Sequence, residues 1–272
     1  MYRPTHLTTA SPEFYSWNKR IAPVIACGLM LFLAGFAQAG SATWKRNPRS
    51  GDWDTKTNWR PATVPNGSAD IATFGLSNTT DVSISANTEV NGIIFTAAAT
   101  NPYTITANPG LTLTISGVGI TNNSGITQNV HIPVDASNNG GTIAFSNSAT
   151  AGSNVFLDND GGTINFLNRS TAGSSGINNE VGGIYNDVGG TINFFNTSTA
   201  GSSDIYKFSG GEAGTTTNFF NRSSAGNSSI DIATGRLISP TTRLQAIRTS
   251  APSIAAVCPS AATPLQAARV SA

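Results

Sequence analysis

The sequence predicts an all-β chain that forms a right-handed parallel β-helix, with an N-terminal tryptophan-rich cap and a disordered C-terminal tail. Two observations predict this fold. Between about Pro61 and Gly235, Asn, Thr, Ser and Gly dominate, a composition poor in helix formers and rich in turn formers and β-branched residues. Within this stretch, variants of one strand-like sequence, GGTINF, occur four times.

Residues 1–39 are predicted to be a signal peptide. Lys19-Arg20 precede an apolar run from Ile21 to Phe36, and Ala37-Gln38-Ala39 then supplies the small residues that signal peptidase accepts. The alternative is a membrane anchor, but the run is about sixteen residues where a spanning helix needs roughly twenty. We therefore expect cleavage after Ala39 and a mature chain that does not span the membrane.

The zone from 40 to 137 is predicted to hold the cap and the first coils. Trp44, Trp53 and Trp59 cluster in TWKRNPRSGDWDTKTNW, which suits a hairpin-like cap whose indoles cover an open sheet edge. The alternative is a carbohydrate platform, in which exposed rings of the same three tryptophans stack on sugars.

Five short alternating runs follow the cap, and each is predicted to be a strand. In LTLTIS, Leu111, Leu113 and Ile115 share one face, as the period of two in a pleated strand requires. Turn signals at Asn66-Gly67, Asn101-Pro102 and Pro109-Gly110 separate the runs. The runs are IATF (71–74), DVSISA (81–86), GIIFT (92–96), YTITA (103–107) and LTLTIS (111–116).

The zone from 138 to 235 contains four repeat units, which begin at Gly140, Gly161, Gly189 and Gly214. Three positions align in all four units: a phenylalanine, the residue two before it and the asparagine two after it. The phenylalanines are spaced by 21, 28 and 25 residues. The aligned positions are Phe145, Phe166, Phe194 and Phe219, then Ile143, Ile164, Ile192 and Thr217, and finally Asn147, Asn168, Asn196 and Asn221.

A period in the twenties, with one strong strand and glycine-marked corners per unit, is typical of a β-helix coil. We expect each Ile-x-Phe pair to point inward and stack on the next, and the Asn column to form a ladder of side-chain amides at a corner. The variable spacing predicts that EVGGIYNDV, at 180–188, projects from one corner. A β-sandwich or stacked hairpins are the alternatives, which near-identical strands do not favour.

The tail from 236 to 272 loses the repeat pattern, with no glycine or aromatic residue and many Ala, Pro, Ser and Arg. Disorder is the expected state. A capped solenoid normally ends in an atypical repeat with a polar face, and the tail contains no such repeat. A truncated or frame-shifted gene is an equally good explanation of the abrupt change.

Charge excludes one class of partner. The net charge is +1, but from Pro61 to Gly235 eleven acidic residues face three basic ones, which leaves this region at −8. An acidic repeat region has no basic surface for phosphate backbones, so we do not expect nucleic-acid binding.

The two cysteines exclude a disulfide framework in the mature chain. Because Cys27 lies in the predicted signal peptide, only Cys258 would remain after cleavage.

The sequence offers little catalytic chemistry. His131 lies in the alternating run NVHIPV, opposite Val130 and Ile132, without a recognisable Cys, Ser or acidic partner, so a solvent-exposed strand residue is the simplest interpretation. Asp158-Asn159-Asp160-Gly161-Gly162 resembles a calcium loop but lacks the further ligands, and an Asx-rich corner is favoured. We expect no metal site, no cofactor and no enzyme activity. β-Helical polysaccharide lyases and hydrolases are the enzyme class that the fold leaves open.

From about Ala42 to Gly235 the chain resembles the N-terminal passenger region of autotransporter-type outer-membrane proteins. ATWKRNPRSGDWDTKTNWRPATVPNGSADIATF carries the resemblance, which continues through VSISANTEVNGIIF and LTISGVGITNNSG to the repeats. It implies export, folding as a β-helix outside the cell, and a role in adhesion or as a surface stalk. Family members also carry a C-terminal translocator barrel, which nothing after Gly235 resembles, so periplasmic residence stays an alternative to surface display.

The leading hypothesis is therefore a non-enzymatic exported passenger, adhesive or structural and truncated, that meets cell-surface or matrix components. A carbohydrate-binding module using Trp44, Trp53 and Trp59 is the first alternative, and a polysaccharide-cleaving enzyme is the second. The ligand, the oligomeric state and the true start codon are left open by the sequence.

Overall fold

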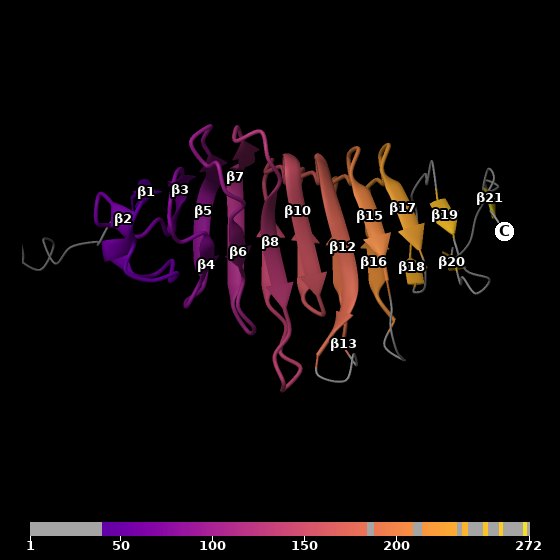
Figure 1. Cartoon of the computed structure of the whole chain (residues 1–272). Helices are drawn as coiled ribbons and strands as arrows, with labels where there is room; N and C mark the ends of the chain where they lie inside the picture. The colour runs from indigo at the N-terminus through magenta and orange to yellow at the C-terminus, as the bar shows by residue number, and fades with distance from the viewer. Residues whose placement is uncertain are drawn as a thin grey trace, which may run out of the picture. The chain divides into compact units, whose positions relative to one another are not determined.

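The computed structural model describes residues 40–183, 188–208 and 214–232, and the short segments 236–238, 247–249, 256–257 and 269–270. Two sheets of stacked parallel strands form a β-solenoid, as the sequence predicts (Figure 1). The one helix in these residues is the single 3-10 turn η1 (Lys56–Asn58). The predicted signal peptide, Cys27 and Cys258 lie outside the described residues.

The two sheets alternate along the chain, so that successive coils contribute one strand to each. Sheet A has the order β2 (Trp59–Arg60), β1 (Ala42–Trp44), β3 (Gly67–Phe74), β5 (Thr88–Phe95), β7 (Thr112–Asn122), β9 (Thr142–Phe145), β11 (Thr163–Phe166), β14 (Thr191–Phe194), β16 (Thr216–Phe219), β18 (Arg236–Ile238) and β20 (Ala256–Val257). Sheet B has the order β4 (Asp81–Ser83), β6 (Thr104–Thr106), β8 (Gln128–Pro133), β10 (Ser153–Asp160), β12 (Ser174–Gly182), β15 (Asp204–Lys207), β17 (Ser229–Ile232), β19 (Ile247–Thr249) and β21 (Arg269–Val270).

The four predicted phenylalanines form one stacked column inside sheet A. Phe145, Phe166, Phe194 and Phe219 are paired in register, with ring centroids 5.0, 4.8 and 4.7 Å apart and ring planes within 8° of parallel. The column two residues earlier is equally buried, and its last member is Thr217. The inward stacking of the Ile-x-Phe pairs is therefore confirmed.

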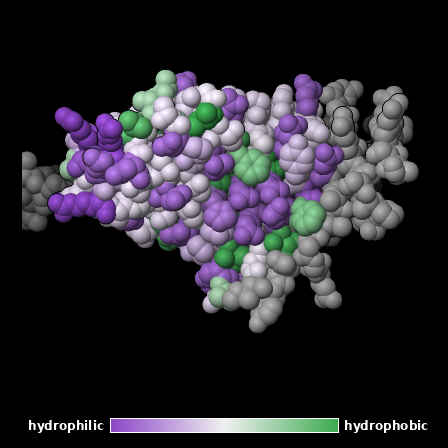
Figure 2. All heavy atoms as spheres, in the orientation of Figure 1, coloured by the Kyte–Doolittle hydropathy of each residue, from purple (hydrophilic) through white to green (hydrophobic). Residues whose placement is uncertain are grey.

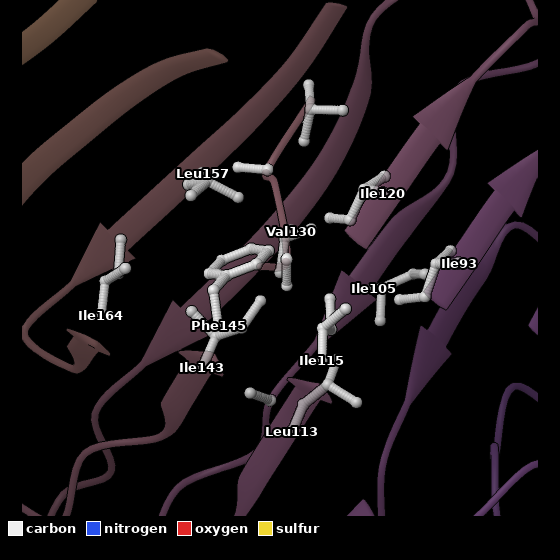
Figure 3. Close-up of a cluster of buried hydrophobic side chains, with 14 of the residues drawn as sticks. Ile93, Ile105, Leu113, Ile115, Ile120, Val130, Ile143, Phe145, Leu157 and Ile164 are labelled. Carbon is white, nitrogen blue, oxygen red and sulfur yellow. The ribbon is translucent and has the colours of Figure 1, made fainter. Parts of the chain in front are cut away.

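Apolar side chains from sheet B close the core from the other side. Figure 3 shows Ile105, Val130 and Leu157, from β6, β8 and β10, facing Ile115 and Phe145 from sheet A. All five are at most 1% exposed. Burial on this scale, repeated in every coil, supplies the apolar column that no single repeat could bury alone.

The tryptophan cluster forms the predicted hairpin-like cap. β1 pairs antiparallel with β2, with Trp44 opposite Trp59, and parallel with β3 of the first coil. Trp59 lies with its ring centroid 4.9 Å from that of Trp53 and 5.5 Å from that of Phe74. The cap therefore covers the first coil with aromatic edge-to-face contacts, an arrangement that aromatic pairs prefer.

The five strand predictions in the first coils are confirmed, in β3 to β7. Leu113 and Ile115 are buried and Leu111 packs against the core, as the alternating pattern predicts. Pro109-Gly110 forms a turn, with Gly110 at a φ of 75°. The predicted turn at Asn66-Gly67 is wrong, because Gly67 begins β3.

The asparagine column lies at a corner, but its ladder differs from the one expected. Asn147, Asn168, Asn196 and Asn221 adopt left-handed φ values of 55° to 58°, a region that asparagine tolerates. The side-chain oxygen of Asn168 accepts a bond from the backbone N–H of Asn147 at 3.1 Å, and Asn196 and Asn221 repeat this contact on the preceding coil. The column is thus joined by side chain to backbone.

The amide-to-amide ladder forms instead on the outer face of sheet A, between the inward Ile and Phe. Asn193 donates to the side-chain oxygen of Asn165 at 2.9 Å, and Asn218 donates to that of Asn193 at 2.8 Å.

Insertions gather at one corner, where a strand of sheet B passes to the next strand of sheet A. The predicted projection at 180–188 is a hairpin in which the end of β12 pairs antiparallel with β13 (Val188–Gly189), and residues 184–187 lie outside the described residues. The link from β8 to β9 also closes on itself, through an antiparallel bridge between Val134 and Gly140. The coil can lengthen here without changing strand register.

Four short strands within 236–272 continue the two sheets in parallel pairing, namely β18, β19, β20 and β21. The other residues of this tail lie outside the described residues. Disorder of the tail as a whole stays a prediction.

The stacked column predicts an asymmetry between two adjacent phenylalanines. Phe194→Ala should lower the free energy of unfolding by about 3 to 5 kcal/mol, because it opens a cavity in the column. Phe195→Ala is the matched control, since Phe195 is half-buried on the outer side, and it should cost about 1 kcal/mol. Urea unfolding followed by circular dichroism measures both. Equal losses for the two variants would contradict the column as the main source of stability.

Candidate functional site

The outer face of sheet B brings together the titratable residues of the central coils. Since alternate residues of a strand share a face, the parallel register builds outward columns across β8, β10, β12, β15 and β17. One column contains His131, Asp158, Asn178, Tyr206 and Asp231. The next column begins with Pro133, Asp160 and Glu180.

His131 and Asp158 form the one ion pair that the structure gives within the described ranges, with Nδ1 and Oδ2 3.2 Å apart. The hydrogen bond that His131 donates to Asp158 raises the pKa of His131, and the same bond lowers the pKa of Asp158. Asn178 approaches the other oxygen of Asp158 at 3.4 Å. Both partners of the pair are about one-third exposed, at 31% and 35% of the side chain, so solvent screens their attraction.

This pair corrects the expectation that His131 has no acidic partner. The solvent-facing position predicted for His131 is confirmed, because Val130 and Ile132 on either side are buried. The partner was missed because Asp158 lies 27 residues away. Only the register between β8 and β10 makes them neighbours, and the GGTINF repeat begins after β8, so no repeated sequence marks that register.

Asp160 and Glu180 occupy paired positions on β10 and β12. Burial is the main cause that raises the pKa of Asp160, and the charges of Asp158 and Glu180 raise it further. We call Asp158, Asp160, Glu180, Asp204 and Asp231 the acidic face, since all five lie on the outer side of sheet B. Like charges on adjacent strands are destabilising, so the acidic face carries a cost in the isolated chain.

The sequence Asp158-Asn159-Asp160 is a strand, and the predicted Asx-rich corner at this position is wrong. All three residues belong to β10, with the two aspartates outward and Asn159 fully buried. Gly161, at a φ of 79°, begins the turn that follows. In the residues that the structure describes, no group of three or more His, Cys, Asp or Glu side chains is arranged to hold a metal ion.

Trp44, Trp53 and Trp59, the candidate glycan contacts, lie in the core, with exposures of 2%, 0% and 0%. Their indole N–H groups donate to the backbone oxygens of Thr79, Pro65 and Trp53 respectively. No indole face is open for a sugar to stack on in this conformation. The geometry therefore favours the cap over the carbohydrate platform.

A polar seam that sequence reasoning missed lies inside the solenoid, where β10, β12 and β15 present Asn159, Asn179 and Lys207 at paired positions. Asn159 donates to the side-chain oxygen of Asn179 at 2.7 Å, and Asn179 donates to the backbone oxygen of Thr216 at 2.9 Å. Burial lowers the pKa of Lys207 to about 7. The alternation in DIYKF (204–208) could have indicated that Lys207 points inward, since Ile205 does.

The chain matches no protein-family model, no curated protein and no solved structure. Among the described residues, no helix has the length and apolar character needed to cross a membrane. Function therefore has to be argued from the surfaces of the solenoid.

The His131–Asp158 pair predicts a defined pH window of stability. Because the pKa of His131 is raised, the pair adds stability below the ordinary histidine pKa, and this stability is lost as the pH rises through the raised value. Because the pKa of Asp158 is lowered, the pair adds stability above the ordinary aspartate pKa, and this stability is lost as the pH falls through the lowered value. The coupling should be largest between roughly pH 4 and 6.5 and stay within about 1 kcal/mol. A double-mutant cycle of His131→Gln and Asp158→Asn measures it. Asp204→Asn is the control, and a coupling that persists at pH 9 would refute the pair.

Lys207 predicts a second pH dependence. The unfolded chain binds a proton below the ordinary lysine pKa while the folded chain does not until about pH 7, so stability falls between these values as pH drops. Lys207→Met should therefore gain stability relative to the wild-type chain, by roughly 3 to 5 kcal/mol, as the pH falls from above 10 to 7. Chemical unfolding of both proteins at both pH values measures this difference. The exposed Lys56→Met should show no such change with pH, and a Lys207→Met variant whose stability follows that of the wild-type chain at both pH values would contradict the prediction.

Proposed function

We propose that the chain is a non-enzymatic exported passenger of the autotransporter type, which presents its solenoid to cell-surface or matrix components. The export step rests on the sequence of residues 1–39, and the outer membrane surface or the extracellular space is the proposed location. Periplasmic residence is the alternative location.

One observation carries the proposal: the same outward polar groups recur in register from coil to coil. On sheet A, Asn165, Asn193 and Asn218 form the amide ladder described above, and the hydroxyl of Thr216 donates to that of Thr191 at 3.2 Å beside it. Asn165 and Asn193 are half-buried and Asn218 is 8% exposed, so the face offers a short row of identical donors and acceptors about 4.8 Å apart. Weak contacts to a repetitive partner then add through multivalency.

This face is also rigid, because each outward side chain stands between two inward ones of the stacked core. Asn165, for example, lies between Ile164 and Phe166, which are fully buried. A preorganised surface loses little conformational entropy on binding. These properties suit an adhesive or structural surface, and the fold alone supports neither a reaction nor a particular ligand.

Export and adhesion are tested separately on the full chain. N-terminal sequencing of protein recovered outside the cytoplasm should begin at Gly40, and an intact Met1 on exported protein would refute the signal peptide. Beads coated with the folded protein should be retained on host cells or matrix. Replacing Asn165, Asn193 and Asn218 together by Ala should lower retention several-fold, about tenfold if the contacts are multivalent.

The matched control replaces Arg169 and Arg222, which lie at a corner of the same repeats, by Ala, and it should leave retention unchanged. Circular dichroism confirms that each variant is folded. Equal retention of folded and heat-unfolded protein would contradict adhesion through the solenoid face.

A further inference from the structure

The cap carries an excess of positive charge that its own residues leave unpaired. Residues 40–60 contain five basic and two acidic residues, a net charge of +3. Arg46, Arg49, Lys56 and Arg60 are exposed, and none forms an ion pair with a carboxylate in the part of the chain that the structure describes. We call these four residues the basic cap.

The two acidic residues of the cap are committed to its internal structure. Asp54 accepts hydrogen bonds from the backbone N–H groups of Ser85 and Ala86, at 2.7 and 3.0 Å. Asp52 accepts a bond from the hydroxyl of Thr55 at 2.6 Å. Asp54 thus holds the cap on the first coil and Asp52 holds a turn within the cap, and neither forms an ion pair with the basic side chains in the part of the chain that the structure describes.

The region from Pro61 to Gly235 has the opposite charge, and five of its eleven acidic residues form the acidic face. Asp160 and Glu180 are cross-strand neighbours, and Asp158 lies on the same side of β10 as Asp160. His131 is the basic group that the described residues place beside them. Figure 2 shows hydrophilic side chains gathered over the middle strands and again at the end that Figure 1 draws in indigo.

Two exposed aromatic side chains extend the acidic face. Tyr206, at 49% exposed, continues the column of Asp158 and Asn178, and Phe208, at 56%, lies two residues further on. Carboxylates beside open aromatic rings favour a cationic partner, above all arginine, through ion pairs and cation–π contacts.

The basic cap cannot reach the acidic face of its own chain. Asp52 bridges to β4, and β6 and β8 separate β4 from β10. Four strand spacings therefore separate Asp52 from β10, and at about 4.8 Å each they add up to about 19 Å along sheet B. This exceeds the length of an arginine side chain. The matching charges can therefore meet only between two molecules.

We propose that the basic cap of one molecule docks on the acidic face of a second copy of this chain. The docking relieves the like-charge repulsion between Asp158, Asp160 and Glu180, and it gives the arginines both carboxylates and the ring of Tyr206. The inference does not rest on the proposed adhesive function, because association is measured on the purified protein alone.

Sedimentation of the full chain at low and high salt tests the docking. Association should appear at about 20 mM NaCl and weaken about tenfold or more at about 500 mM, because surface charge pairs are screened. Arg46→Glu with Arg49→Glu, which takes residues 40–60 from +3 to −1, should abolish it. So should Asp160→Lys, Glu180→Lys and Asp204→Lys together, which takes the five residues of the acidic face from −5 to +1. Arg222→Glu, a charge reversal outside both the basic cap and the acidic face, is the control that should leave association intact.

The decisive measurement mixes the two charge-reversed variants. Each alone presents two patches of like sign and stays monomeric, but the reversed cap of one matches the reversed face of the other, so the mixture should associate again. A mixture that stays monomeric, or wild-type protein that is monomeric at every salt concentration, overturns the proposal. So does a cap that binds an anionic polysaccharide while the chain remains monomeric.

Discussion

The stacking of each inward phenylalanine on the next is the interaction on which the rest of the structure depends. The rings are 4.7 to 5.0 Å apart, which is the spacing of hydrogen-bonded strands, so ring stacking and strand pairing are satisfied by the same register. A slip of one residue would turn Phe166 and Ile164 to solvent. Every other column, inside and outside, takes its alignment from this one.

The fold was accessible from the sequence because its repeats are nearly identical where the core is formed. Phe145, Phe166, Phe194 and Phe219 mark the coils directly, and the three tryptophans mark the cap by composition and spacing. The candidate site was not accessible in the same way. His131 belongs to a strand before the first repeat, so its partner follows from hydrogen-bond register, which no local pattern encodes.

The asparagines show the same limit at the level of single contacts. The sequence identifies a column at Asn147 and its equivalents, but whether an amide bonds to another amide or to backbone depends on φ. The left-handed φ at these corners directs the side-chain oxygen to a backbone N–H, whereas the extended backbone at Asn165 and Asn193 leaves the amides free to pair with each other. Conformation at one residue therefore decides the chemistry of the ladder.

The interior is less uniformly apolar than the phenylalanine column suggests. Asn159, Asn179 and Lys207 are all at most 1% exposed, and the side-chain oxygen of Asn159 has no hydrogen-bond partner among the described residues. Burying such groups is costly unless they are paired or neutral. The amide bonds of the seam and the lowered pKa of Lys207 are the physical responses to that cost, and they make this edge of the core the part most sensitive to pH.

At the corner where the insertions lie, the loops can change while the paired strands stay the same. Length and composition can vary there from coil to coil, as the hairpin after β12 shows, while the strands on either side keep their pairing partners. New loops at this corner leave the pairing of the neighbouring strands in place. The links that leave β8 and β12 here are therefore a natural starting point for grafting peptide sequences onto the solenoid.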